Sequence, residues 1–541
     1  MRALLKRQLS FHPNREWKLK LQQSSLLHCG KVLTLLRHAV RSSWTPAARS
    51  SKAVIDMTLG NTRVTQSKRK SIADMTHSHI KWAKKFRSAE PFACTCGKCA
   101  QGMPGQARAE SVFPTVFGTT SKYTPTPDKT ALQHELQAAF KTLGQAMADH
   151  GVVDLTTFQS AISQADLAPL VGTPTENAVV TKLDVIKIQK ALSKWVVLPL
   201  DKDSGSTYLM CPTLFWQRLN KLYSVDTPNY TAVSLNADRT LPDITHGLNT
   251  RTLAGLPPAA ASKRGIPYGY LQPKDKDLEN RDRPVVSYFR HPHKAKLRIA
   301  GRALMWILQR IQSAGLCSSF SAFDTREYPQ SMASVGTLPP NTHVYLGDVK
   351  NMYTNIPHPR LYEVVDWVLA RAAELCPGLT VFVPNSSARK PCQGDYPHAG
   401  VAGHTVTLSQ LSEVLKWDIA HIYFTLGDRI LRQTEGVPMG SPCSPALAVA
   451  LCMHSEHHFI ATHPDVVIYR GFRYIDDLLL FLKEPCADIA TMYPPPLQLE
   501  EEVVGDQTQG YTWGFLEACS TLRPDGAVDI YSPLPQECIP N

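Results

Sequence analysis

The sequence predicts an α+β fold in which helices back an antiparallel sheet, and two observations carry this prediction. Residues 343–349 alternate like a buried strand, and helical spacing follows over 360–375. Two β-rich runs, 466–474 and 478–482, then flank a pair of adjacent acids as the strands of a hairpin would. A strand, then helices, then a hairpin is the order expected of a sheet backed by helices.

The other predicted elements follow from the same periodicities. Apolar residues recur at helical spacing over 131–150, so an ordered helix is expected to begin the folded body. The β-rich runs 195–200 and 208–210 predict a hairpin. Further helices are predicted over 294–314, 410–424 and 445–462. No apolar run approaches the roughly 18 residues that a membrane-spanning helix needs, so no transmembrane span is predicted.

The positive charge of the chain lies in its N-terminal quarter. Residues 1–130 carry 23 Lys and Arg against 6 Asp and Glu, which leaves 35 against 40 for the rest. A basic, acid-poor arm suits a nucleic acid, because each neutralised phosphate releases counterions. The alternative is an organellar transit peptide, since residues 1–52 are rich in Arg and Ser with Glu16 as the only acid. Parts of this extension are expected to be disordered.

The chain contains 13 cysteines, and their scattered positions predict reduced thiols rather than a disulfide framework. Cys94, Cys96 and Cys99 form a C-x-C-x-x-C pattern, and His77 or His79 would supply a fourth zinc ligand. A structural zinc site usually has two clean ligand pairs, and the second pair is missing here. The pattern therefore leaves two interpretations open, a Zn²⁺ site and a group of ordinary thiols.

Three aspartates form the candidate catalytic site. Asp476 and Asp477 stand at the tip of the predicted hairpin between hydrophobic strands, where their burial is costly without a cation. Asp348, at the end of the run 344–347, would face them with a third carboxylate, as an octahedral Mg²⁺ site requires. Two Mg²⁺ ions about 4 Å apart activate a hydroxyl and stabilise a leaving pyrophosphate, which is polymerase chemistry. Asp477 is expected to be the more peripheral of the three.

By itself, an aromatic-x-Asp-Asp tetrapeptide also occurs by chance, and three further segments strengthen the prediction by their order. Tyr353 follows Asp348 by five residues, where its ring could exclude a 2′-hydroxyl; the alternative is a packed tyrosine. The segment 433–445 is dense in Gly and Pro before a predicted helix, so its backbone could approach a nucleic-acid strand. Upstream, Lys202, Lys274 and Arg283 could clamp a triphosphate, although each alone would also fit a solvated basic face.

These segments together resemble the reverse transcriptases of Penelope-like retroelements, which are relatives of telomerase. The resemblance covers roughly residues 190–520 and rests on the motifs PLDKD, PKDKD with RPVVS, GDVKNMYTNIP, QTEGVPMGSPCSP and RYIDD. Residues 497–503 and 513–517 also look like later motifs of that family, with Glu517 where an aspartate is more usual.

The resemblance implies a right-hand polymerase with fingers and a ferredoxin-like palm. The implied domains are a basic extension, a helical lead-in, fingers, a catalytic palm and a thumb remnant, over residues 1–130, 131–189, 190–335, 336–517 and 518–541 respectively. Only 24 residues follow Glu517, so the thumb is expected to be short or missing. No GIY-YIG nuclease follows either. A truncated gene model would also explain the short C-terminal region and the missing nuclease.

The resemblance also implies the activity, RNA-directed DNA polymerisation with Mg²⁺ at Asp348, Asp476 and Asp477. The residues expected to contact the incoming nucleotide or the template are Lys202, Lys274, Arg283, Tyr353, Gln433 and Gly436. The expected partners are an RNA template, a DNA primer and dNTPs, with no membrane, and the expected compartment is the nucleus, with a mitochondrion or plastid as alternative.

Two other classes of function stay open: an RNA-binding scaffold that has lost catalysis, and an organellar RNA-maturation factor. The three intact acids argue against the scaffold, because buried like charges have no physical reason to stay together without a cation.

Overall fold

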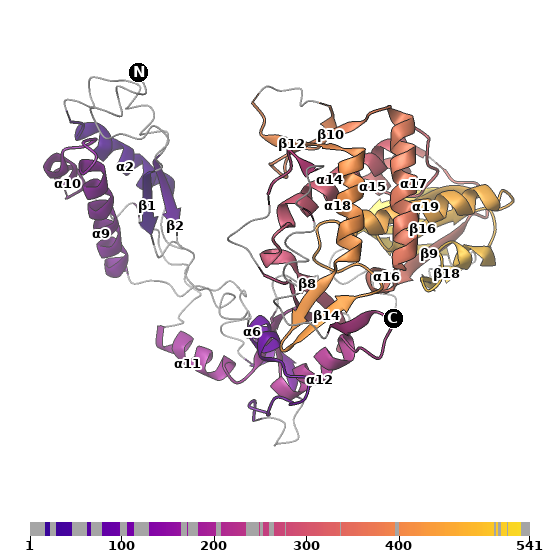
Figure 1. Ribbon diagram of the computed structural model, residues 1–541, viewed down its shortest axis with the longest axis horizontal. Helices are drawn as coiled ribbons and strands as arrows, with labels where there is room; N and C mark the ends of the chain where they lie inside the picture. Colours follow the sequence, from indigo (N-terminus) through magenta and orange to yellow (C-terminus); the bar gives the residue numbers. More distant parts are fainter. Residues whose placement is uncertain are drawn as a thin grey trace. The chain divides into compact units, whose positions relative to one another are not determined.

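The computed structural model describes most of the chain from residue 78 onward and shorter pieces before it. The described residues are 17–21, 29–45, 62–66, 78–97, 105–112, 129–163, 170, 182–201, 207–233, 248, 253–258, 265–275, 277–335, 337–394, 400–502, 505–506, 510–516 and 518–531. The chain forms two compact units (Figure 1). The first consists of Met1–Trp82, Ala93–Phe215 and Pro273–Arg281, and the second of Ala83–Phe92, Trp216–Gln272 and Asp282–Asn541.

The first unit contains a helical cluster with its own hydrophobic core. Its elements are β1 (Trp17–Leu21), α2 (Cys29–Ser42), β2 (Thr62–Gln66), α9 (Lys129–Ala148) and α10 (Leu155–Ser163). Strands β1 and β2 pair in parallel. Leu36, Phe140 and Phe158 are fully buried between the three helices. The helix predicted over 131–150 is confirmed by α9.

A three-stranded sheet in the first unit has the order β3-β5-β4. Its strands are β3 (Gln106–Arg108), β4 (Val196–Pro199) and β5 (Thr207–Met210), and the helices nearest in sequence are α6 (Ser78–Lys85), α7 (Ala109–Val112), α11 (Lys182–Leu192) and α12 (Pro212–Leu222). Strands β4 and β5 pair antiparallel with Val197 opposite Leu209. This pairing confirms the hairpin predicted from the runs 195–200 and 208–210.

The second unit is built around a four-stranded antiparallel sheet of order β15-β16-β9-β17. Its strands are β9 (His343–Lys350), β15 (Ile468–Tyr474), β16 (Asp477–Leu482) and β17 (Gln498–Glu502). One face carries Leu346, Leu479 and Phe481, which pack on Trp513 in a single hydrophobic cluster. All residues from Leu478 to Leu482 are buried, which requires cover on both faces of the sheet.

Long helices lie beside this sheet (Figure 1). They are α14 (Lys294–Ser313), α17 (His358–Leu375), α18 (Leu408–Ala420) and α19 (Ser444–Thr462). The second unit also contains the shorter helices η5 (Tyr288–Arg290), α15 (Glu327–Val335), α16 (Met352–Asn355) and η6 (Ala487–Thr491). Helix α19 contacts β15 directly, because Glu456 forms an ion pair with Arg473. The antiparallel sheet backed by helices, and hence the α+β fold class, is confirmed.

Three further sheets complete the described part of the second unit. The first, of order β6-β14-β13-β7-β8, consists of β6 (Tyr230–Val233), β7 (Tyr268–Lys274), β8 (Asp277–Ser287), β13 (Tyr423–Leu426) and β14 (Arg429–Gln433). The others are β11-β10-β12, from β10 (Thr380–Pro384), β11 (Cys392–Gln393) and β12 (Gly403–Thr407), and β18-β19-β20-β21, from β18 (Gly505–Asp506), β19 (Gly510–Phe515), β20 (Ala518–Leu522) and β21 (Val528–Tyr531). Strands β7 and β8 include residues of both units.

The helix predicted over 410–424 is correct at its start and too long at its end. Helix α18 begins after Thr407, whose side chain and that of Gln410 form a capping box. It ends at Ala420, and Tyr423 instead pairs with Arg432 in a β-hairpin. No helix of the described residues is long and apolar enough to cross a membrane.

Candidate functional site

The three predicted acids meet on the central sheet of the second unit. Asp348 in β9 lies directly opposite Asp477 in β16. Asp476 occupies the hairpin tip, where its carbonyl oxygen accepts a hydrogen bond of 3.0 Å from the Val349 amide. One oxygen from each carboxylate lies within 4.8 Å of the other two, and all three residues are half-buried. Such close like charges destabilise a fold unless a cation joins them, and this all-oxygen set suits Mg²⁺.

The turn that carries Asp476 has an unusual backbone. Tyr474 pairs with Asp477, so only Ile475 and Asp476 connect the two strands. Ile475 has φ +61°, and a β-branched residue in this left-handed region is strained. The guanidinium of Arg473 donates a hydrogen bond of 2.9 Å from Nη1 to the Ile475 carbonyl oxygen. This contact holds the strained peptide in place next to Asp476.

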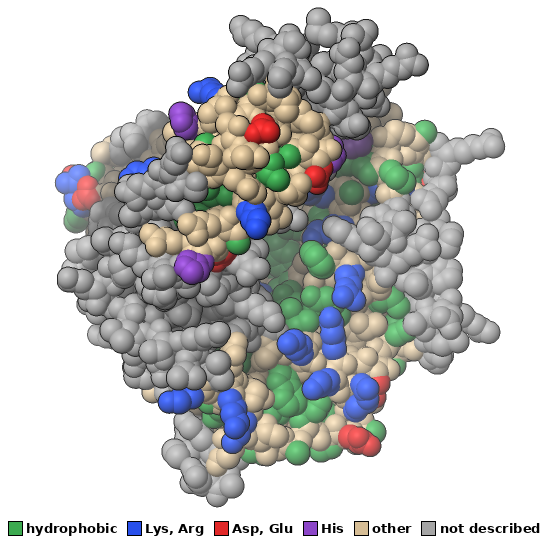
Figure 2. Space-filling view, turned by 90° about the vertical axis from the view of Figure 1, so that its left-hand side faces the viewer, with side chains coloured by type: hydrophobic (Ala, Val, Ile, Leu, Met, Phe, Trp, Pro, Cys, Tyr) green, Lys and Arg blue, Asp and Glu red, His purple; other side chains and the backbone are tan. Residues whose placement is uncertain are grey.

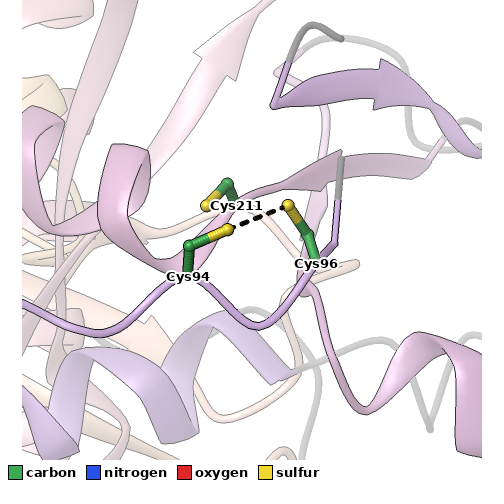
Figure 3. A group of neighbouring side chains, drawn as sticks. All are labelled: Cys94, Cys96 and Cys211. Carbon is green, nitrogen blue, oxygen red and sulfur yellow. Dashed lines mark hydrogen bonds between the residues drawn. The ribbon is translucent and has the colours of Figure 1, made fainter. Parts of the chain in front are cut away.

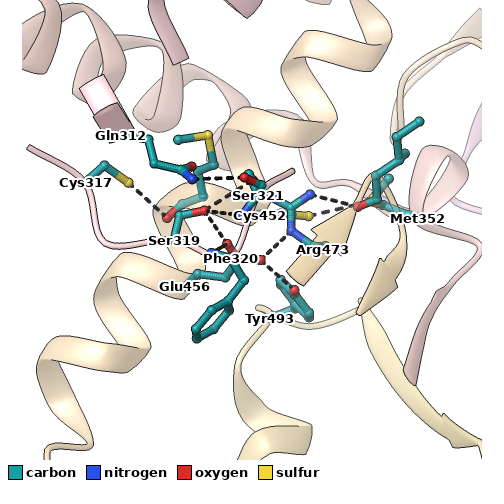
Figure 4. Close-up of polar contacts among 12 residues, drawn as sticks. Gln312, Cys317, Ser319, Phe320, Ser321, Met352, Cys452, Glu456, Arg473 and Tyr493 are labelled. Carbon is teal, nitrogen blue, oxygen red and sulfur yellow. Dashed lines mark hydrogen bonds and ion pairs between the residues drawn. The ribbon is translucent and has the colours of Figure 1, made fainter. Parts of the chain in front are cut away.

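Arg473 itself is anchored in a buried polar network (Figure 4). Arg473 and Glu456 of α19 are both fully buried and form an ion pair, and Arg473 Nη2 also donates to Ser321 Oγ. Glu456 accepts further hydrogen bonds from Ser319 Oγ at 2.6 Å and from the Tyr493 hydroxyl at 3.0 Å. Both buried charges are therefore satisfied, and the network links helix α19 to the turn that carries Asp476.

Tyr353 interacts electrostatically with Asp476. It belongs to α16, the short helix that follows β9. Burial raises the pKa of the Tyr353 phenol well above its ordinary value, the negative charge of Asp476 raises it further, and the positive charge of Arg283 opposes both. The structure therefore brings together three residues that the sequence predicted separately. The phenol stays neutral over the whole physiological pH range.

The glycine-rich segment packs its backbone onto α16. Gly436 has φ +76°, and a Cβ atom there would lie 2.4 Å from the Tyr353 carbonyl oxygen. The amides of Gly436 and Val437 donate to the carbonyl oxygens of Ile356 and Tyr353 at 2.7 and 2.6 Å. His358 Nε2 lies 2.7 Å from the Gly436 carbonyl oxygen, and burial lowers the pKa of His358, so the neutral ring donates this bond. Only glycine fits at position 436.

The structure describes only some of the other residues predicted to contact the nucleotide. Gln433 is buried at the end of β14, where its backbone N–H donates to the Ile422 carbonyl oxygen at 2.9 Å. Lys274 belongs to the first unit, where it forms a β-bridge with Asp201. Asp201 of the PLDKD segment and Lys274 of the PKDKD segment therefore lie side by side. Lys202 and Glu517 lie outside the described residues.

The turn before α19 is held by a buried carboxyl group that the sequence did not reveal. Ser441 Oγ donates a hydrogen bond of 2.9 Å to Asp418 Oδ2 of α18. The same turn also lies close to α14, since a Cβ atom on Gly301 would lie 2.2 Å from the Pro442 carbonyl oxygen. The turn therefore contacts both α18 and α14.

Asp418 makes the stability of this turn depend on pH. Burial raises the pKa of Asp418 from 3.8 to about 6, although hydrogen bonds from Ser441 and Cys443 oppose the shift. The folded protein therefore holds this proton more tightly than the unfolded chain, so stability falls as the pH rises from about 4 through 6. At about 1.4 kcal/mol per pKa unit, the loss amounts to roughly 3 kcal/mol.

We expect Asp418→Asn, which cannot titrate, to lose most of this dependence and to be at least as stable as the parent at pH 8. Urea unfolding at pH 4 and pH 8 measures the difference, with the exposed Asp465→Asn as the control. A pH dependence unchanged in Asp418→Asn would show that another group causes it.

Two of the predicted zinc ligands meet a third cysteine in the first unit (Figure 3). Cys94, Cys96 and Cys211 have sulfur atoms within 4.8 Å of one another. Cys99 and His77 lie outside the described residues. His79 is not a member of the group, and its Nδ1 lies 3.2 Å from the Val197 carbonyl oxygen. Cys211 was missed because it lies far away in sequence without a ligand pattern around it.

Comparisons with known proteins give remote structural similarity only. No protein-family model matches the chain, and no curated protein matches it in sequence. The apo telomerase of Candida tropicalis is 12% identical with a TM-score of 0.43, over 73% of this chain and 69% of that chain. The telomerase of Candida albicans in complex with the TWJ fragment of telomeric RNA is 11% identical with a TM-score of 0.42, over 86% and 77%.

A Candida tropicalis telomerase truncated from its C-terminal domain is 11% identical with a TM-score of 0.41, over 93% of this chain and 95% of that chain. These solved structures are what the chain is similar to. The geometry by itself defines an α+β protein with a carboxylate triad on an antiparallel sheet.

Proposed function

We propose that the chain is an RNA-directed DNA polymerase that adds deoxynucleotides to a primer 3′-hydroxyl. The observation that carries this proposal is the position of Asp348 opposite Asp477, with Asp476 at the adjoining hairpin tip. The order of the motifs along the chain supports it, as does the packing of the Gly436 backbone on Tyr353. The proposed affiliation is with the reverse transcriptases of Penelope-like retroelements, and the proposed architecture is the right hand of fingers and palm.

The acids and their neighbours would have different roles in the reaction. Asp348 and Asp476 would hold Mg²⁺, with Asp477 at the periphery. When bound, the metal would activate the primer hydroxyl and neutralise charge on the leaving pyrophosphate. Arg283, whose positive charge interacts electrostatically with Tyr353, would bind the triphosphate. The neutral phenol of Tyr353 would lie against the sugar without repelling the phosphates.

Tyr353 is expected to select deoxynucleotides by the bulk of its ring. Tyr353→Ala should therefore lower the preference for dNTPs over rNTPs by roughly 10- to 100-fold, since it removes a steric barrier of a few kcal/mol. The ratio of kcat/KM for the two substrates measures this preference. Tyr353→Phe keeps the ring and is the matched control, with the preference of the parent. Equal preference in the Ala variant and the parent would make Tyr353 a packing residue.

Nucleic-acid partners are proposed from charge as well as from the site. The excess of Lys and Arg in residues 1–130 suits a polyanion. On the face drawn in Figure 2, Lys and Arg side chains gather with few Asp and Glu among them. Counterion release should make RNA binding weaken steeply with salt.

Extension of a DNA primer annealed to an RNA template tests the proposed function. The purified full chain should add the complementary dNTP and none of the other three at a comparable rate. Tight RNA binding without any extension would instead favour the catalytically inactive RNA-binding scaffold.

A further inference from the structure

Three cysteines of the first unit converge from two separate segments. Cys94 and Cys96 lie in an irregular segment, residues 91–97, and Cys211 lies between β5 and α12. The thiols point toward one another (Figure 3). We propose that Cys94, Cys96 and Cys211 bind a structural Zn²⁺ ion. This site is independent of the proposed polymerase activity, because it contains none of the residues assigned to that activity.

The spacing of the sulfur atoms suits zinc. The Sγ atoms of Cys94 and Cys96 lie 3.4 Å apart, and each lies within 4.8 Å of the Cys211 sulfur. Zn–S bonds of about 2.3 Å at tetrahedral angles place sulfur ligands about 3.8 Å apart, which is within this range. None of the three cysteines is in a disulfide. After small movements of the side chains, the three thiolates would supply three of the four ligands of a tetrahedral Zn²⁺ ion.

The residues around the three cysteines indicate that such an ion would stabilise the local structure. Residues 91–97 form no helix or strand and are largely exposed, so they bury little apolar surface of their own. Cys211 is fully buried, and its amide donates to the Gly105 carbonyl oxygen at 2.6 Å. The Thr95 hydroxyl donates to the Lys194 carbonyl oxygen at 2.7 Å. A thiolate-bound Zn²⁺ would add a strong link between this segment and the β3-β5-β4 sheet.

Soft thiolate ligands favour zinc over the hard cations that carboxylates bind. The two proposed metal sites of the chain therefore differ in chemistry, with sulfur ligands in the first unit and oxygen ligands at Asp348, Asp476 and Asp477 in the second. A metal exchanged at one site need not exchange at the other.

Metal content of the purified full chain tests the proposal. Protein prepared under reducing conditions should contain about one zinc ion per chain, and Cys211→Ser should lose it. Cys486→Ser removes a thiol of another part of the chain and is the matched control, with the zinc content of the parent. Replacement of zinc by Co²⁺ in the parent should give the absorption of thiolate-to-cobalt charge transfer, which carboxylate sites do not give.

A parent chain that lacks zinc and shows no thiolate absorption with Co²⁺ would overturn the proposal, as would a Cys211→Ser variant with full zinc content. The cobalt spectrum of the parent keeps the test valid if the variant fails to fold. A chelator should also lower the melting temperature of the parent and leave that of Cys211→Ser unchanged. Equal shifts in both proteins would contradict a site at Cys211.

Discussion

Asp476→Asn is expected to abolish primer extension while RNA binding persists. The substitution keeps the size of the side chain and removes one of the three charges that face each other at the hairpin tip. Loss of several kcal/mol of transition-state stabilisation corresponds to a rate lower by about a thousandfold or more. RNA affinity should change little, since it depends on basic side chains elsewhere.

Single-turnover extension and RNA binding at two salt concentrations separate these effects. Glu502→Gln is the matched control, because it removes an exposed carboxylate from the neighbouring strand β17 and should extend primers like the parent. Equal losses of extension and RNA binding in Asp476→Asn would contradict the assigned role of the acid.

The second large effect is expected at the buried ion pair beside the turn that carries Asp476. Arg473→Met leaves the Glu456 carboxylate buried without its cation, and breaking such a pair costs about 3–5 kcal/mol of unfolding free energy. The double variant Arg473→Met with Glu456→Leu removes both charges, so it should recover most of that loss. Urea unfolding of the two single variants and the double variant measures both effects.

The double variant also separates stability from positioning. It still lacks the guanidinium that donates to the Ile475 carbonyl oxygen, so its primer extension should stay well below that of the parent. Arg473→Lys keeps the charge without the planar fork that reaches Glu456, Ser321 and Ile475 together, and it should also extend poorly. Parent-like extension by a stable double variant would show that Arg473 does not position the turn.

Sequence periodicity predicted β9, β15 and β16 of the central sheet because their patterns are local. The alternation in β9 and the two runs around Asp476 need no knowledge of distant residues. The same reasoning placed Asp348 near the hairpin tip, and the structure adds the register that sets it opposite Asp477. The end of α18 was predicted wrongly because Ile422 and Phe424 continue the helical spacing, whereas cross-strand pairing decides their conformation.

Residues that act through distant partners could not be predicted in this way. Glu456 is the only acid in the apolar helix α19, which is a weak sign of a buried partner, but nothing local identifies Arg473 as that partner. Cys211 lies more than a hundred residues from Cys96 and carries no ligand spacing. Asp418 looks like any polar residue of an amphipathic helix until Ser441 is placed against it.

The most direct test of the central claim is single-turnover incorporation of one dNTP opposite an RNA template, measured over a range of Mg²⁺ concentrations in the parent and in Asp348→Asn. The parent should incorporate only the complementary nucleotide, with a rate that rises and saturates with Mg²⁺, and Asp348→Asn should incorporate none at any concentration. Incorporation by Asp348→Asn at the rate of the parent would remove the carboxylate triad from the chemistry and contradict the proposed function.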